Sequence, residues 1–271
     1  MMRLLSILVP LMLAGLAAFG RRPVGVAFYD VDRIYDTLPA LFYNDEEHTP
    51  QGRYRWNTER YQRKIRNTAA VIDTMALDIV ALWGVENEQV VRDLATACRS
   101  EYSYLHRTLN TLDGMDFALL YYGDRFYPLD VEVGRRYLYV EGELEGRTIG
   151  LALCGDESTA RWLVGDLRDE HPGIPLVVLG RIGKLPAATF GLVDATARAE
   201  KAGRGTIRRA GRWEMRDRIL VDTTLHAYGA DVFVRRYLVD QKSGNPRPTF
   251  SRGRYQGGFG YSLPVFVYIR P

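Results

Sequence analysis

The sequence predicts a single α/β domain in which mixed β-sheets are covered by helices. Segments typical of buried strands alternate with segments of helical periodicity in the first half of the chain, and again over residues 157–180. Hairpin signals between these segments indicate antiparallel pairing, which argues against a doubly wound parallel sheet. The composition, 46% hydrophobic and 25% charged over 271 residues, is that of a globular protein and excludes a disordered or fibrous chain.

The first half of the chain is predicted to alternate between buried strands and amphipathic helices. The apolar residues 24–29 are the first strand. A helix is expected from Thr58, a favourable N-cap, because apolar residues then recur at helical spacing as far as Met75. Residues 78–83 are a second buried strand, and helical periodicity follows over residues 88–98.

Paired strands are predicted in the middle of the chain. Residues 102–106 and 116–122 flank an Asp-Gly turn, and residues 135–144 alternate, turn and return as residues 148–154. The remaining predicted elements are a helix over residues 157–170 and strands over residues 174–180, 218–221, 231–234 and 265–269. Two polar, glycine-containing segments, residues 199–212 and 241–260, are expected to be exposed loops.

Residues 1–20 are predicted to be a signal peptide, and residues 21–271 a single domain. One arginine, an apolar run over residues 4–19 and small residues at its end are typical of such a leader. The run is shorter than the roughly 20 residues that span a bilayer, although an uncleaved anchor is the alternative. No later segment reads as transmembrane. We therefore expect an exported protein, periplasmic or secreted.

Charge and residue counts narrow the classes of function. The 36 basic residues against 33 acidic ones give a net charge of +3, too small to indicate a nucleic-acid partner. Two cysteines exclude a disulfide scaffold. An oxidising compartment would allow Cys98 and Cys154 to pair, but two separate buried thiols are favoured because Cys154 ends an apolar run. Four scattered histidines argue against a histidine-built metal centre.

Six segments in order resemble the endonuclease/exonuclease/phosphatase family, and an exported bacterial branch of it. Residues 28–37 (FYDVDRIYDT) resemble its opening F-Y-N-V-E-N-L-F-D-T, and residues 45–56 (DEEHTPQGRYRW) its D-E-E-F-T-P-E-G-x-x-x-W loop. The other four segments are LWGVEN at 82–87 for L-Q-E-V-E-N, DFALLY at 116–121 for D-V-A-L-L-Y, DRILV at 217–221 for D-x-I-x-V, and FGYSLPV at 259–265 for F-S-D-H-L-P-V.

This resemblance implies the deoxyribonuclease I-like fold, a four-layer sandwich of two mixed β-sheets with helices outside. It also implies phosphoester hydrolysis with Mg²⁺, which the family holds with a Glu and a nearby Asn. A G-D-x-N segment orients the attacking water, an S-D-H segment supplies an Asp–His pair, and a further His lies on a middle strand.

The chain departs from the family at each of these catalytic positions. The opening Asn is replaced by Asp30 and the metal-binding Glu by Gly84. The remaining replacements are Gly155 on the middle strand, Arg181 and Gly183 in the G-D-x-N segment, and Tyr261 and Ser262 for Asp and His of S-D-H. Apolar strand residues survive while the polar catalytic groups do not, so we expect a degenerate member that binds no metal and needs no cofactor.

A few polar residues remain as candidates for a residual pocket. Glu86 lies two positions after Gly84, on the same strand face, although the pair it forms with the next Asn is also typical of a helix cap. Asp116 and Asp217, which join Asp30 and Glu86 in this predicted pocket, are expected to accept hydrogen bonds from neighbouring groups rather than act as bases.

The basic residues are open to a structural and a functional interpretation. The arginines between residues 204 and 218 are expected to be solvated, with a phosphate contact as the alternative. Arg181 needs a carboxylate if it is buried, and Asp30, Glu86, Asp116 and Asp217 are the candidate partners. Alternatively, Arg181 and Lys184 bind an anion from a ligand or partner.

The predicted function is therefore that of an exported pseudoenzyme that binds a protein partner of the cell envelope or an anionic ligand. Two alternatives stay open at the level of sequence. One is a metal-dependent phosphodiesterase, nuclease or phosphatase with a rearranged site, and the other is a structural subunit of an envelope complex.

Overall fold

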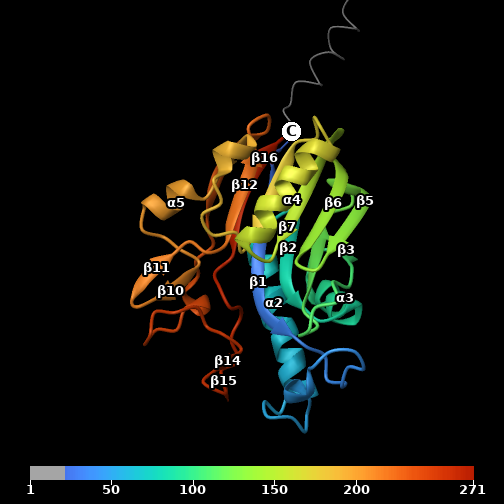
Figure 1. The fold of residues 1–271 in the computed structure, drawn as a ribbon. Helices are drawn as coiled ribbons and strands as arrows, with labels where there is room; N and C mark the ends of the chain where they lie inside the picture. Colours follow the sequence, from blue (N-terminus) through green and yellow to red (C-terminus); the bar gives the residue numbers. More distant parts are fainter. Residues whose placement is uncertain (1–21) are drawn as a thin grey trace, which may run out of the picture.

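A computed structural model describes residues 22–271, which form two six-stranded β-sheets with helices packed against them (Figure 1). The α-helices are α2 (Thr58–Met75), α3 (Glu88–Ala97), α4 (Glu157–Glu170) and α5 (Ala197–Lys201). The 3₁₀ turns are η1 (Glu46–His48), η2 (Ala187–Phe190) and η3 (Arg236–Leu238). The strands of the two sheets are β1 (Val24–Ile34), β2 (Ile79–Val85), β3 (Ser103–His106), β4 (Asp116–Tyr121), β5 (Phe126–Gly134), β6 (Tyr137–Leu144), β7 (Arg147–Cys154), β8 (Leu176–Gly180), β9 (Leu192–Asp194), β12 (Arg218–Asp222), β13 (His226–Val232) and β16 (Val265–Arg270).

Both sheets are mixed, as the sequence predicts. The first sheet has the order β13-β16-β1-β2-β4-β3 and the second the order β5-β6-β7-β8-β12-β9. Each contains one parallel pair, β1 with β2 and β7 with β8, while its other neighbours run antiparallel. The parallel pairs need crossover connections, which α2 and α4 supply. The predicted fold class is confirmed.

The core fills the space between the sheets and beneath the helices. Strands β1 and β2 are buried on both faces because the second sheet covers one face and α2 with α3 covers the other. A separate apolar cluster lies where α4 packs on the second sheet, and Figure 1 shows α4 lying across β7. The segment that carries α5 and the hairpin of β10 (Ile207–Arg209) with β11 (Arg212–Glu214) lies to one side of the sheets.

The strand register brings one end of both sheets together. Asp30 in β1 pairs with Trp83 in β2, just before the register of this pair shifts. In the second sheet, Gly180 at the end of β8 pairs with Cys154 at the end of β7 and with Arg218 at the start of β12. The turns that follow or precede these residues therefore share a single edge, which we call the strand edge.

Several details differ from the sequence prediction. Helix α2 is capped by Asn57, whose side chain accepts from the Arg60 amide, and not by Thr58. The segment 199–212 is not a plain loop, since it contains part of α5 and the β10–β11 hairpin. The segment 241–260 contains the short pair β14 (Phe250–Ser251) and β15 (Arg254–Tyr255). The favoured prediction of two separate thiols is confirmed, since Cys98 and Cys154 are free, although Cys98 is only partly buried.

The predicted signal peptide, residues 1–20, lies outside the residues that the structure describes. From residue 22 onwards, no helix combines the length and the apolar character that crossing a bilayer requires.

Gly180 should be intolerant of any side chain, because its φ of +143° and its surroundings both require glycine. A Cβ at Gly180 would lie 2.0 Å from the carbonyl oxygen of Cys154. We expect Gly180→Ala to lower the free energy of unfolding by more than about 2 kcal/mol in urea denaturation. Gly165 in α4 is the matched control, since a Cβ there meets nothing within 4 Å and Ala favours a helix. Equal effects of the two substitutions would contradict this account of the strand edge.

Candidate functional site

The strand edge carries residues that the sequence resemblance aligned with the family's catalytic positions. The Arg181 amide donates to the Cys154 carbonyl over 3.0 Å, which fixes the turn after β8 beside the end of β7. The Tyr261 amide donates to the Asp30 carbonyl over 3.1 Å, so the segment before β16 lies against the end of β1. These contacts bring together the positions that the sequence resemblance aligned with catalytic groups.

An arginine bridges two buried carboxylates at the centre of this edge. Arg216 lies immediately before β12, and one of its terminal nitrogens donates to Asp30 Oδ2 over 2.7 Å. Its Nε donates to Asp217 Oδ1 over 2.7 Å, and a terminal nitrogen also reaches Asp217 Oδ2 at 3.1 Å. Because Asp30 belongs to the first sheet and Asp217 precedes a strand of the second, the guanidinium joins the two sheets.

Two of the replaced family residues complete this network. The Ser262 hydroxyl donates to Asp217 Oδ2, and the Thr206 hydroxyl accepts from the backbone amides of Arg216 and Asp217 at 3.2 and 3.1 Å. The ring of Tyr261 lies against the Arg216 guanidinium, 4.6 Å from its central carbon to the ring centroid. Tyr261 and Ser262 therefore hold the ion pair in the places where the family pattern has Asp and His.

The charges of the network are balanced only when Arg181 is included. The pKa of Asp30 is raised overall, chiefly by burial and further by the neighbouring Asp217 charge. The charges of Arg216 and Arg181 act in the opposite direction and lower it. Burial alone would lower the pKa of Arg216, but Asp217 and Asp30 raise it above its ordinary value. The guanidinium of Arg216 is permanently charged. Asp30 and Asp217 therefore share one cation that is hydrogen-bonded to them, Arg216, and a second that is not, Arg181.

Arg181 does not make the internal ion pair that was one of its two predicted roles. Arg216, which lies in the segment before β12, already donates to Asp30 Oδ2. The Arg181 Nε is buried and has no hydrogen-bond partner among the described residues. Its side chain lines a cavity of about 440 Å³ at the strand edge, which it shares with three other arginines.

The residues present do not fit the Mg²⁺ that the family resemblance implies. Gly84 has φ +97°, and a Cβ there would lie 3.1 Å from the Arg33 amide nitrogen, so a Glu at this position would be strained. The Asp30 oxygens accept from the Asp32 amide and from Arg216. Among residues 22–271, no three His, Cys, Asp or Glu side chains converge to form a cation site.

The predicted residual pocket of Asp30, Glu86, Asp116 and Asp217 is not formed as one cluster. Asp30 and Asp217 meet at Arg216. Glu86 accepts instead from the Asp36 amide at 2.5 Å, and burial raises its pKa to about 8. Asp116 accepts from the Leu109 amide at 2.8 Å and lies 2.9 Å from His106 Nε2. The next residue after Glu86, Asn87, caps α3 by accepting from the Val90 amide.

Lys184 is not brought together with Arg181 as an anion site. Its side chain is exposed, and its backbone amide donates to Glu157 Oε2 over 3.1 Å. Gly183, with φ +54°, turns the chain away from the cavity so that its amide donates to the Arg216 carbonyl over 3.1 Å. Gly155 completes the edge, with its amide donating to the Arg136 carbonyl over 2.8 Å.

A buried lysine supports the segment that carries Tyr261 and Ser262. Lys64 projects from α2, is 1% exposed, and donates from Nζ to the Phe259 carbonyl over 2.6 Å. Burial lowers its pKa to about 8, although the charges of Asp32 and Asp30 oppose the shift. The helix is thereby fastened to the turn before β16.

Comparison with known proteins agrees with this geometry. Residues 25–155 match the sequence profile of the Endonuclease/Exonuclease/phosphatase family. The match covers just under half of the chain and shows its similarity to this family. No curated protein resembles the chain significantly in sequence.

Several solved structures have the same fold over nearly the whole chain. A mannosyl-6-phosphatase from Bacteroides thetaiotaomicron VPI-5482 is 14% identical with a TM-score of 0.62, covering 92% of this chain and all of its own (100%). An endonuclease/exonuclease/phosphatase from Bacteroides vulgatus is 14% identical with a TM-score of 0.60, covering 92% and 99%. A humanized D. rerio TDP2 is 13% identical with a TM-score of 0.59, covering 92% and 99%. At these identities the likeness shows the fold alone.

The sequence did not single out two arginines that are largely buried at or shortly before β12. Arg216 stands in a run of arginines expected to be solvated, but its side chain is only 13% exposed. Arg218 is likewise buried and pairs with Asp194 and Glu200 at 2.7 Å each. The available signal was their position, because Arg216 shortly precedes the predicted strand at residues 218–221 and Arg218 is its first residue.

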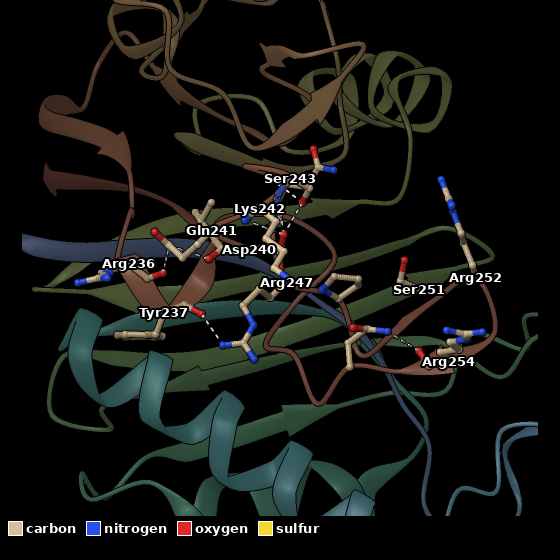
Figure 2. A pocket seen from close by; sticks show the side chains of 15 residues that line it. Arg236, Tyr237, Asp240, Gln241, Lys242, Ser243, Arg247, Ser251, Arg252 and Arg254 are labelled. Atoms are coloured by element: carbon tan, nitrogen blue, oxygen red, sulfur yellow. Dashed lines mark hydrogen bonds between the residues drawn. The ribbon is translucent and has the colours of Figure 1, made fainter.

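A larger groove lies away from the strand edge. It measures about 1340 Å³ and is lined by residues between positions 236 and 256. In Figure 2, Arg236 and Arg252 lie at opposite ends of this groove, and their guanidinium groups do not converge. The Asp240 carboxylate is occupied by the Ser243 amide and hydroxyl at 2.7 and 2.9 Å. We therefore assign the candidate site to the smaller cavity, which is lined by Arg181, a residue whose charge acts on the buried Asp30.

Removal of Arg216 should destabilise the fold strongly. Arg216→Gln leaves two buried carboxylates without their bonded cation, and such losses cost about 3–5 kcal/mol. We expect a drop of this size in the free energy of unfolding near neutral pH. The drop should shrink as the pH falls toward about 4, because protonation removes the unpaired charge. Urea denaturation across this pH range measures the effect.

The matched control for this substitution is Arg252→Gln, since Arg252 is exposed and makes no ion pair among the described residues. It should change stability by less than about 0.5 kcal/mol. A loss for Arg216→Gln as small as that of the control would show that the bridge contributes little.

Proposed function

We propose that this chain is a non-hydrolytic member of the endonuclease/exonuclease/phosphatase family that acts by binding. The observation that carries the proposal is the Arg216 bridge between Asp30 and Asp217. In a phosphoesterase of this family that region must hold a divalent cation, and a guanidinium in contact with the same carboxylates repels one. The same bridge occupies the oxygens that the metal would need.

The other replaced positions support this proposal. Arg181 adds a second positive charge where the family pattern has the acid of G-D-x-N. Tyr261 and Ser262 serve the ion pair in place of the Asp–His pair that moves protons in the family. A new centre built on Glu86 is disfavoured because its oxygens already serve the Asp36 amide. We therefore infer a pseudoenzyme, a protein that keeps the fold of the family without its hydrolytic chemistry.

What the protein binds follows from the chemistry of the altered cleft. A half-buried arginine without a partner favours an anionic ligand, or an acidic side chain of a protein partner. Neither the net charge nor the spacing of basic groups favours nucleic acid. We place the protein outside the cytoplasm, on the basis of the leader-like residues 1–20.

The purified protein should not hydrolyse phosphoesters. We expect no Mg²⁺- or Mn²⁺-dependent release of product from DNA, RNA or p-nitrophenyl phosphate, and no heat of Mg²⁺ binding in isothermal titration calorimetry. The physical reason is that metal binding would have to displace Arg216 from two buried carboxylates. Metal-dependent turnover that Asp30→Ala or Glu86→Ala abolishes would overturn the proposal.

Export is tested separately. Protein recovered from the native host should begin within a few residues of Arg21, as established by N-terminal sequencing. A membrane-bound form that still begins at Met1 would favour the anchor instead.

A further inference from the structure

The cavity beside the ion-pair network has a strongly cationic wall. It measures about 440 Å³, within the range of small-molecule sites. We call it the arginine pocket, and its cationic residues are Arg33, Arg135, Arg136 and Arg181. Asp113 is the only carboxylate that lines this pocket in the described part of the chain.

Two of the four guanidinium groups have carboxylate partners at the rim. Arg33 lies 3.2 Å from Asp113, and Arg136 lies 2.5 Å from Asp156. All four of these side chains are at least one-third exposed, so these pairs contribute little stability and can open. Arg135 and Arg181 make no salt bridge with any residue between 22 and 271.

Arg181 is the group that most needs an anion. It is half-buried, it cannot lose its proton, and its Nε lies out of reach of water without a partner. The nearest internal candidate, Asp30, already receives a hydrogen bond from Arg216 at 2.7 Å. Because Arg181 lines the pocket, an anion that enters it would meet the guanidinium at the atoms that face the cavity.

The rest of the wall sets the size and character of the ligand. Trp83 and Met115 are almost fully buried and give the pocket an apolar floor, while Leu112 at the rim is 80% exposed. Guanidinium groups bind planar or tetrahedral oxyanions through paired N–H donors, which phosphate and carboxylate both match. A compact anion with two or more charges would engage Arg135 and Arg181 together.

We propose that the arginine pocket binds a compact polyanionic small molecule, with Arg135 and Arg181 as its principal contacts. This inference rests on the proposed non-hydrolytic function, because it assigns the ligand that the altered cleft holds. The ligand's charged group is either a phosphate or a cluster of carboxylates. It remains intact when bound, since no residue of the pocket is placed to activate water.

The test is calorimetric titration of the full exported chain with pyrophosphate, inorganic phosphate and citrate, at constant ionic strength. Pyrophosphate and citrate separate phosphate from carboxylate chemistry, and chloride at equal ionic strength measures simple screening. We expect Arg135→Ala and Arg181→Gln each to weaken binding by about tenfold to a hundredfold, as the loss of a charge-assisted hydrogen bond does. Arg181→Lys should recover part of the affinity, because it keeps the charge but not the paired donors.

Arg252→Ala is the matched control, since it removes an exposed arginine from the larger groove and should leave affinity unchanged. Thermal unfolding of each variant shows whether the fold is intact. If Arg252→Ala weakens binding and Arg135→Ala does not, the site lies in the larger groove and the proposal is overturned. The proposal is also overturned if none of the three anions binds. Release of phosphate from pyrophosphate with Mg²⁺ would instead overturn the non-hydrolytic function and leave the pocket standing.

Discussion

The hydrogen bonds of Arg216 to Asp30 and Asp217 are the contacts on which the rest of the strand edge depends. They connect the end of a strand in one sheet with the start of a strand in the other, within 2.7 Å on each side. In a fold made of two sheets packed face to face, the apolar core holds the layers together but does not fix how their edges meet. A charged bridge with defined geometry supplies that alignment, and the turns carrying Arg181, Tyr261 and Ser262 are positioned by it.

The replacements at the catalytic positions form one consistent set. A carboxylate without its metal would be a buried, uncompensated charge, which is costly. Here each buried acid at the strand edge has a partner: Asp30 and Asp217 share Arg216, and Ser262 donates to Asp217. At Gly84, where the family pattern has a Glu, the φ of +97° and the nearby Arg33 amide would strain any side chain.

The sequence predicted the elements that have a regular local pattern of apolar residues, and it missed those that depend on contacts between distant residues. The helix over residues 157–170 was predicted with both its bounds, because its apolar periodicity is regular and Asp156 caps its first turn. Strand β5 was missed, because it is an edge strand with exposed alternate residues and a bulge at Pro128, and so has no apolar run. The segments that the family pattern aligned with catalytic groups lie together at the strand edge, since the Arg181 amide bonds to the Cys154 carbonyl and the Tyr261 amide to the Asp30 carbonyl. Arg216 could not be assigned, because pairing across two sheets leaves no mark in the local sequence.

The attachment of Lys64 to the Phe259 carbonyl makes this lysine a natural reporter of motion. With a pKa of about 8, a sizeable share of its amine is neutral and nucleophilic in mildly alkaline buffer, but at 1% exposure a reagent cannot reach it. Acylation of Lys64 therefore requires α2 and the turn before β16 to separate for a moment. The chain has few lysines against which to distinguish the product. The rate of that labelling would time the opening of the segment that holds Tyr261 and Ser262, without any engineered label.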